Sequence, residues 1–225
     1  MDILYPIGDG SKYKDWELRF SLRSVEKHLK GFNRVFIVGR KPHWLNTNEV
    51  VYIRKEDTGR KHESIYLKIM ASVSAGISDP FQFWNDDHFL LQDLNVEDLP
   101  YYYDNTIEYW AGKAQGKYKA SCLNTKPGKY FDVHTPIIYT HEGLKEAFKD
   151  IDWKKDPLIK STFAHWLGVE GEEINDIKIQ GNFKADQIKA IIHKKMFFSI
   201  GPYALYHEMR KVLDELYPNK SKYEL

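Results

Sequence analysis

The adjacent carboxylates Asp86 and Asp87 are the part of the sequence best suited to metal and phosphate chemistry. They follow Asn85 in an Asn-Asp-Asp turn, directly after the aromatic, apolar run 81–84. Carboxylates are hard oxygen ligands of the type that Mg²⁺ and Mn²⁺ select. A metal held there would bridge the two phosphates of a nucleoside diphosphate and neutralise a leaving phosphate. The alternative is a solvated turn that caps the next element, but two carboxylates after an aromatic strand favour the metal site.

Asp9 lies between Gly8 and Gly10 at the end of the first predicted strand. Glycines on both sides allow the backbone to approach a ligand closely, and the carboxylate would hold a hydrogen-bond donor of a ribose or a base. An Asp-Gly pair also forms ordinary turns, and from these residues alone the turn is the better interpretation.

Arg19 and Arg23 are four residues apart on a predicted helix, so both point to one side of it. Two guanidinium groups near a ligand site would clamp a diphosphate through paired hydrogen bonds. A pair of surface arginines matched by Glu26 or Asp15 is the commoner outcome on an amphipathic helix.

His134 precedes Thr135 at the start of the predicted strand 134–139. Histidine is the usual general base for a hydroxyl proton near neutral pH. Asp132 would lie on the same side of such a strand and raise the pKa of His134 by favouring the imidazolium. The alternative is a structural histidine bonded to the backbone. No HxH or HExxH spacing occurs, so the histidines do not predict a zinc site.

The elements that must position these residues alternate between strand and helix patterns. Their order predicts a parallel or mixed sheet covered by helices, with ligands bound beyond the carboxyl ends of the strands. We expect Asp15 to cap the first helix. The predicted strands are 2–6, 34–38, 50–54, 80–84 and 89–91, and the predicted helices are 16–29, 64–76, 141–149, 158–167 and 204–217.

Composition excludes several classes of protein. The 225 residues carry 33 basic and 32 acidic side chains, a net charge of +1 that argues against a polyanion-binding surface spread over the whole chain. The single cysteine, Cys122, excludes an internal disulfide and fits a cytoplasmic protein. No apolar run predicts a membrane span, and the first ten residues do not resemble a signal peptide.

The sequence also lacks the motifs of several common enzyme classes. The phosphate-binding glycine motifs of dehydrogenases and P-loop NTPases are absent, as is the serine hydrolase elbow.

Four segments carry a resemblance to a known family: ELRFSLRSVEKH at 17–28, RVFIVG at 34–39, PHWLN at 42–46 and FWNDDHF at 83–89. Together they resemble the Stealth family of sugar-phosphate transferases and related phage and bacterial glycosyltransferase-like proteins. The resemblance covers residues 1–92 and, more weakly, 131–148. The sequence departs from the family at Ile7-Gly8 and at 59–64 (GRKHES), a segment that would help to shape the donor pocket.

The resemblance implies a GT-A-like α/β fold, a nucleotide-sugar donor and a divalent cation, Mn²⁺ or Mg²⁺. We expect one domain, 1–225, with a nucleotide-sugar-binding half at 1–100 and an acceptor-side half at 101–225. Carried over by position, the metal ligands are Asp86 and Asp87, the catalytic residues Asp87 and His134, and the donor-binding residues Asp9, Gly10, Arg19, Arg23 and Asn85.

The leading hypothesis is therefore a metal-dependent glycosyltransferase-like enzyme that moves a sugar from a UDP-linked donor to a hydroxyl acceptor. A sugar-1-phosphate transferase of the Stealth type is the first alternative. A non-catalytic nucleotide-sugar-binding module is a second. A third is a phage DNA-base glycosyltransferase, because the 110–130 stretch combines aromatic side chains with five lysines: Lys113, Lys117, Lys119, Lys126 and Lys129. A glycan is the preferred acceptor.

Overall fold

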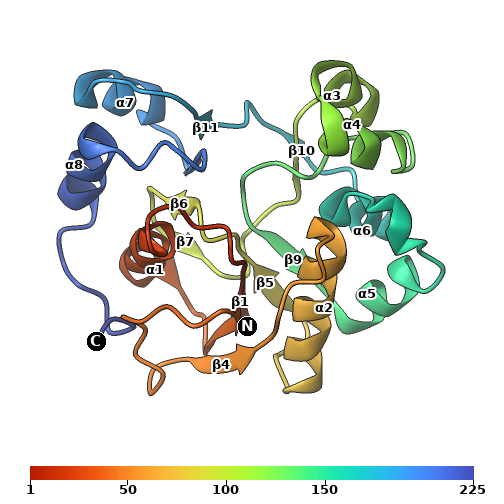
Figure 1. Ribbon diagram of the computed structural model, residues 1–225, viewed down its shortest axis with the longest axis horizontal. Coiled ribbons are helices and arrows are strands. Elements are labelled where there is room, and N and C mark those ends of the chain that lie inside the picture. Colours follow the sequence, from red (N-terminus) through yellow and green to blue (C-terminus); the bar gives the residue numbers. More distant parts are fainter.

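A five-stranded sheet forms the centre of the protein in the computed structural model, which describes residues 1–225 (Figure 1). The strand order is β4-β3-β1-β5-β9, and neighbours run parallel except for the edge pair of β5 and β9. The strands are β1 (Asp2–Ile7), β3 (Val35–Gly39), β4 (Val51–Arg54), β5 (Phe81–Phe83) and β9 (Ile137–Tyr139). The predicted mixed, mainly parallel sheet is confirmed.

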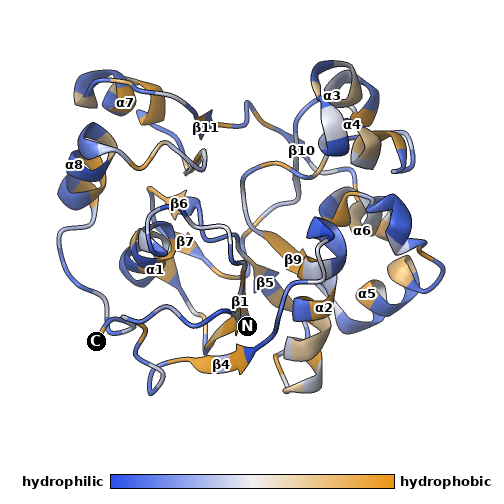
Figure 2. Cartoon of the chain, viewed as in Figure 1, coloured by the Kyte–Doolittle hydropathy of each residue, from blue (hydrophilic) through white to orange (hydrophobic).

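Helices cover both faces of this sheet and extend beyond it, and they mix hydrophobic and hydrophilic residues (Figure 2). They are α1 (Trp16–His28), α2 (Lys61–Ser74), α3 (Ile107–Lys113), α4 (Gly116–Leu123), α5 (His141–Phe148), a 3-10 turn (Trp153–Lys155), α6 (Ile159–Leu167), α7 (Ala185–Ile192) and α8 (His207–Leu216). Short strands complete the chain: β2 (Leu29–Lys30), β6 (His88–Leu90), β7 (Leu94–Asn95), β8 (Tyr102–Tyr103), β10 (Glu172–Glu173), β11 (Lys178–Ile179) and β12 (Phe197–Ile200).

Alternate residues of the central strands enter two different cores. Tyr5 and Ile37 pack in the cluster that contains the apolar face of α1. Leu4 and Phe36 point the other way, into the cluster that contains residues of α2, α5 and α6. Successive side chains of a strand face opposite sides of a sheet, so strands buried on both faces, such as β3 and β1 from Ile3 onward, must carry consecutive apolar residues. Their consecutive apolar residues are the reason that the sequence predicted them.

Two lobes rise above the sheet, one built on α3 and α4 and the other on α7 and α8 (Figure 1). Each has its own apolar cluster: the first includes Ile107 and Cys122, and the second includes Ile188 and Leu213. The second cluster also contains Phe20, so α1 packs against the sheet on one side and against this lobe on the other. The sequence did not predict α3, α4 or α7, which are only seven or eight residues long.

Three local expectations are corrected. Asp15 precedes α1 with a φ of 60° and makes no capping hydrogen bond, because its carboxylate accepts from Arg40 instead. Helix α2 begins at Lys61, three residues earlier than predicted. No strand begins at His134, since β9 starts only at Ile137. None of the helices combines the length and the apolarity that crossing a membrane requires.

Candidate active site

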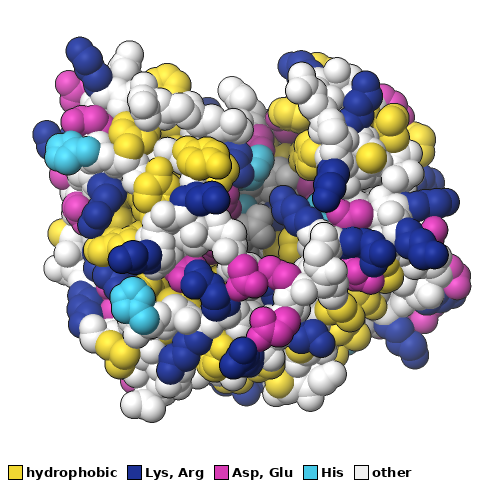
Figure 3. Space-filling view, in the orientation of Figure 1, with side chains coloured by type: hydrophobic (Ala, Val, Ile, Leu, Met, Phe, Trp, Pro, Cys, Tyr) yellow, Lys and Arg dark blue, Asp and Glu magenta, His cyan; other side chains and the backbone are white.

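A cleft of about 800 Å³ opens at the carboxyl ends of β1, β4 and β5, between the two lobes. In Figure 3 it is the hollow at the upper centre, and acidic, basic and histidine side chains are visible inside it. Of the candidate site residues, those that line it are Asp9, Gly10, Asn85, Asp86, Asp87 and His134. The fold gathers most of them because parallel strands end at one edge of the sheet.

The Asn-Asp-Asp turn follows β5 and forms the floor of the cleft. One carboxylate oxygen of Asp87, Oδ2, accepts from Lys178 Nζ at 3.1 Å and from Ser199 Oγ at 3.0 Å. The other, Oδ1, is buried and has no hydrogen-bond partner. A buried carboxylate oxygen without a donor is costly unless a ligand or cation completes it.

The two aspartates of the turn have opposite electrostatic surroundings. Burial raises the pKa of Asp86, and the negative charges of Asp87 and Glu17 raise it further. Burial acts in the same direction on Asp87, but the positive charge of Lys178, together with His88 and His134, outweighs it and leaves the pKa of Asp87 below its ordinary range. The turn thus holds one firmly ionised carboxylate beside one whose ionisation is opposed by its neighbours.

These carboxylates fit a divalent cation only in part. No group of three or more His, Cys, Asp or Glu side chains is arranged to enclose a metal ion. Asp86 and the unpartnered Oδ1 of Asp87 nevertheless supply two hard oxygen ligands in a cluster of negative charge. Mg²⁺ is commonly held by one or two carboxylates together with substrate phosphates and water, so a nucleoside diphosphate would have to provide the remaining ligands.

Asp9 and Gly10 lie on the rim of the cleft, in the loop after β1. The Asp9 side chain is exposed, and its carboxylate lies 3.5 Å from Arg40 Nε. Its backbone N–H donates to Asp57, which in turn is paired with the buried Lys68. Lys68 also donates to the carbonyl of Ile7 at 2.7 Å. Asp57 and Lys68, which the sequence did not single out, therefore fix the position of this loop.

His134 lies in the loop before β9, and Asp176 holds it at two points. The carboxylate of Asp176 accepts from the backbone N–H of His134 at 3.0 Å and contacts the ring Nδ1 at 2.6 Å. A carboxylate on one ring nitrogen fixes the orientation of the imidazole and leaves Nε2 to exchange a proton. The ring centroid lies 6.4 Å from that of His88, which itself follows Asp87.

Asp132 does not serve His134, which corrects the prediction. Its carboxylate accepts from the backbone N–H groups of Lys160 and Ser161 and from Ser161 Oγ at 2.6 Å, so it caps α6. The side chain of Lys160 returns to the histidine loop and donates to the carbonyls of Val133 and Thr135, at 2.8 and 2.6 Å. The start of α6 and the loop around His134 are thus locked together.

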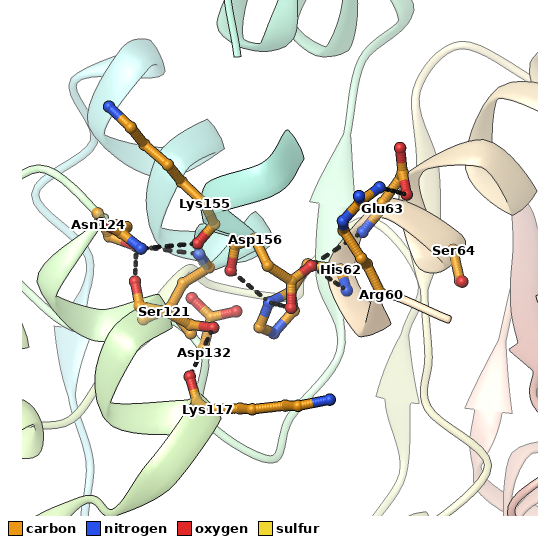
Figure 4. A network of polar contacts seen from close by, with 12 residues as sticks. Arg60, His62, Glu63, Ser64, Lys117, Ser121, Asn124, Asp132, Lys155 and Asp156 are labelled. Carbon is orange, nitrogen blue, oxygen red and sulfur yellow. Dashed lines mark hydrogen bonds and ion pairs between the residues drawn. The ribbon is translucent and has the colours of Figure 1, made fainter. Parts of the chain in front are cut away.

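The segment 59–64, where the sequence departs from the family, forms the α2 wall of the cleft. Arg60 at the start of the helix provides no side-chain cap. Asp156 takes that role from a distant loop: its carboxylate accepts from the backbone N–H groups of His62 and Glu63, at 2.9 and 3.3 Å (Figure 4). The N-terminus of α2 therefore already has an anionic partner within the chain.

Arg19 and Arg23 lie outside the cleft, and the expectation that they clamp a diphosphate is corrected. Arg23 Nε lies 2.7 Å from one oxygen of Glu224, and Arg19 Nε lies 3.3 Å from the other. The Arg19 guanidinium also stacks on Trp16 and Trp44. Their shared helix face is turned toward the C-terminal segment of the chain, not toward the ends of the strands.

Asp176, Lys160 and Lys178 are cleft residues that the sequence analysis missed. Asp176 and Lys178 lie in or beside a two-residue strand, where no periodic pattern marks them. Lys160 could have been identified from the sequence, because it lies on the apolar side of a predicted amphipathic helix, next to the buried Ile159. A lysine at such a position is buried or reaches into a cavity.

Comparison with solved structures identifies the fold of the chain. The galactosyltransferase LgtC, solved in complex with donor and acceptor sugar analogues, superposes with a TM-score of 0.53 over 99% of this chain and 97% of that one, at 12% sequence identity. A variant of LgtC with one active-site substitution gives a TM-score of 0.52 at 13% identity. The chain has the GT-A glycosyltransferase fold, as the resemblance implied.

Two sequence relatives are both named capsular polysaccharide phosphotransferases. The capsular polysaccharide phosphotransferase CpsJ of Streptococcus thermophilus is 29% identical over 156 residues, which is 64% of this chain and 61% of the relative. SacB of Neisseria meningitidis serogroup A, also named a capsular polysaccharide phosphotransferase, is 25% identical over 187 residues, which is 73% of this chain but 34% of the relative. The chain thus spans less than two thirds of the length of either relative, and no family model matches. These relatives support the resemblance to Stealth-like sugar-phosphate transferases.

Proposed function

We propose that this protein transfers a sugar-1-phosphate group from a nucleotide-sugar, with UDP as the nucleotide, to a hydroxyl group of a glycan. The observation that carries the proposal is the placement of an aspartate-supported histidine and a buried lysine in one cleft with the Asp86–Asp87 turn. A base, cationic groups and a pair of metal-type carboxylates are what attack on a phosphorus atom requires. The phosphotransferase names of the sequence relatives support the same chemistry.

In this reaction His134 is the general base. It removes the proton of the acceptor hydroxyl while the oxygen forms a bond to the phosphorus that carries the sugar. The bond from that phosphorus to the bridging oxygen breaks, and the nucleoside monophosphate leaves with the electron pair. Asp176 holds the imidazole in place and stabilises the imidazolium that forms.

We propose Asp86 and Asp87 as the ligands of a divalent cation, Mn²⁺ or Mg²⁺, which when bound would offset the negative charge of the diphosphate. Lys178 pairs with Asp87 at 3.1 Å and keeps that carboxylate ionised. Asp9, Gly10 and Asn85 line the same cleft and are proposed to contact the donor. Fixing the reacting groups in one geometry supplies much of the rate of such a transfer.

Glycosyl transfer is the second candidate, favoured by the fold that the chain shares with LgtC. The acceptor would then attack the anomeric carbon, and a nucleoside diphosphate would be released. The same base, metal ligands and cleft serve either reaction, so the bond that breaks distinguishes the two.

The test is an analysis of the released nucleotide. The protein is incubated with a panel of UDP-sugars, Mn²⁺ and glycan acceptors, and UMP and UDP are quantified by chromatography, with Asp87→Asn as the inactive control. Release of UMP together with a phosphodiester product is expected. Release of UDP would support glycosyl transfer instead. Absence of both, with no Mn²⁺-dependent binding of UDP or UMP, would contradict the proposal.

A further inference from the structure

Lys160 carries a buried ammonium group that has no counter-ion in the chain. The residue is 5% exposed, and its Nζ donates to the carbonyls of Val133 and Thr135. No carboxylate oxygen lies within 4.0 Å of Nζ, although Asp132, Asp176 and Asp87 act on it from farther away. Two of the three N–H groups of the ammonium are therefore used, both on neutral acceptors.

The other lysines of the cleft that are buried or half-buried are neutralised. Lys68 is paired with Asp57, and Lys178 with Asp87. Lys160 thus differs from both, although it is buried like Lys68. A buried charge without a partner is unfavourable, and it is retained where a ligand supplies the opposite charge.

The position of Lys160 specifies where that ligand lies. The residue lines the cleft, and its Nζ lies 5.8 Å from the centroid of the Phe83 ring, at the end of β5 beside the Asn-Asp-Asp turn. Its two carbonyl partners flank His134 in the chain. An anion on the third N–H would therefore lie between the metal-type carboxylates and the general base.

We propose that Lys160 binds an oxygen of the phosphoryl group that is transferred, which is the phosphate next to the sugar in the donor. This inference rests on the proposed function. As the acceptor oxygen bonds to phosphorus and the nucleoside monophosphate leaves, Lys160 stabilises the non-bridging oxygens, while the proton goes to His134. Because one side chain holds both the base loop and the phosphoryl oxygen, it also sets the distance between them.

The test compares the affinities of UDP and UMP, measured by calorimetry in the presence of Mn²⁺. UDP contains the distal phosphate and UMP lacks it, so their ratio of affinities reports on contacts to that phosphate. In Lys160→Met and Lys160→Gln we expect the preference for UDP over UMP to fall about 10- to 100-fold, the range for a lost hydrogen bond to a charged group, with UMP affinity unchanged. Lys160→Gln retains a donor for the carbonyls of the His134 loop, so it covers the case in which the methionine variant fails to fold. Lys145→Met, on the exposed side of α5, is the matched control for loss of one positive charge.

The outcomes separate the two proposals. A UDP preference that is unchanged in both Lys160 variants would overturn the role of Lys160 and leave the proposed function standing. If the wild-type protein binds neither nucleotide, the proposed function fails, and the experiment is repeated with inorganic pyrophosphate. Pyrophosphate binding that is lost in Lys160→Gln would then retain Lys160 as an anion site, and binding that is unaffected would overturn it.

Discussion

The two walls of the cleft each contain a buried lysine, and the two lysines are used differently. On the α2 wall, Lys68 is neutralised by Asp57 and holds the carbonyl of Ile7, so its hydrogen bonds fix the loop of Asp9. The other wall is formed by the start of α6 and the loop around His134, and we call it the α6 wall. There, Lys160 contacts only two neutral carbonyls. The same residue type is therefore structural where its charge is matched, and available to a ligand where it is not. Incomplete electrostatic pairing is expected at a functional site, and it is the reason that we propose the α6 wall as the reactive one.

The largest effect is expected on the α6 wall, at the histidine that Lys160 supports. Replacing His134 with Ala should lower turnover by about 10²- to 10⁴-fold, the range for loss of a general acid–base group, with donor affinity retained. Steady-state rates and calorimetric donor titration on the same preparation check this. Near-normal turnover would mean that His134 is architectural and that the base lies elsewhere.

The next largest effect is expected at the Asp86–Asp87 turn on the floor of the cleft, where substitutions should abolish the effect of the proposed cation on UDP binding. Asp86→Asn and Asp87→Asn each remove one of the two proposed ligands, so the enhancement of UDP binding by Mn²⁺ should disappear in both. The comparison is UDP affinity with Mn²⁺ against UDP affinity with chelator, with melting temperature as the control for folding. Mn²⁺ enhancement that persists in both single variants would place the cation away from this turn.

Replacing each of the two lysines with methionine should distinguish the lysine that stabilises the fold from the lysine that is proposed to bind a ligand. Lys68→Met leaves Asp57 Oδ1 and the Ile7 carbonyl without the donor that Lys68 supplies, so we expect a loss of about 1–3 kcal/mol in the free energy of unfolding. Lys160→Met also frees two carbonyls but removes an unmatched buried charge, so its loss should be smaller. Urea denaturation of both variants measures this difference. A larger loss for Lys160→Met would contradict the structural difference between the walls.

The pH dependence of UDP binding should also report on the charge of Lys160. Burial lowers the pKa of Lys160 to about 8, although the carboxylates of Asp132, Asp176 and Asp87 oppose the shift. The ammonium is charged below this pH and loses its charge as the pH rises through it. The preference for UDP over UMP should therefore decrease from about pH 7 to about pH 9 in the wild type and stay flat in Lys160→Met, as titrations at the two pH values would reveal. A wild-type preference that rises with pH would exclude an ammonium as the phosphate ligand.

The smallest effect is expected outside both walls. Arg19→Lys and Arg23→Lys alter the contacts with Glu224 but touch nothing in the cleft. We expect UDP affinity to stay within about twofold of wild type, while the melting temperature falls by a few degrees, since about 1 kcal/mol corresponds to about 2–4 °C in a domain of this size. Thermal denaturation and UDP titration of each variant provide the check. Weakened UDP binding at an unchanged melting temperature would contradict this expectation and indicate that these arginines contribute to donor binding.

The strands of the central sheet and the acidic residues on the floor of the cleft could be predicted from local sequence patterns. The consecutive apolar residues of β1 and β3 are required because both faces of these strands are buried, and that requirement is legible without the fold. Asp9 and the Asp86–Asp87 turn come shortly after the ends of the parallel strands β1 and β5, so local order along the chain was enough to bring them to one edge of the sheet.

The side chains that complete the site could be identified only from the packing of distant elements. Asp176 is 42 residues from His134, and Glu224 is 201 residues from Arg23, so no spacing along the chain indicated either pairing. Asp132 shows the same limit from the other side: it is close to His134 in sequence but caps α6 instead. Periodicity reports which face of an element is apolar, whereas the partner of a polar group depends on how separate elements pack, and that is fixed by the whole fold.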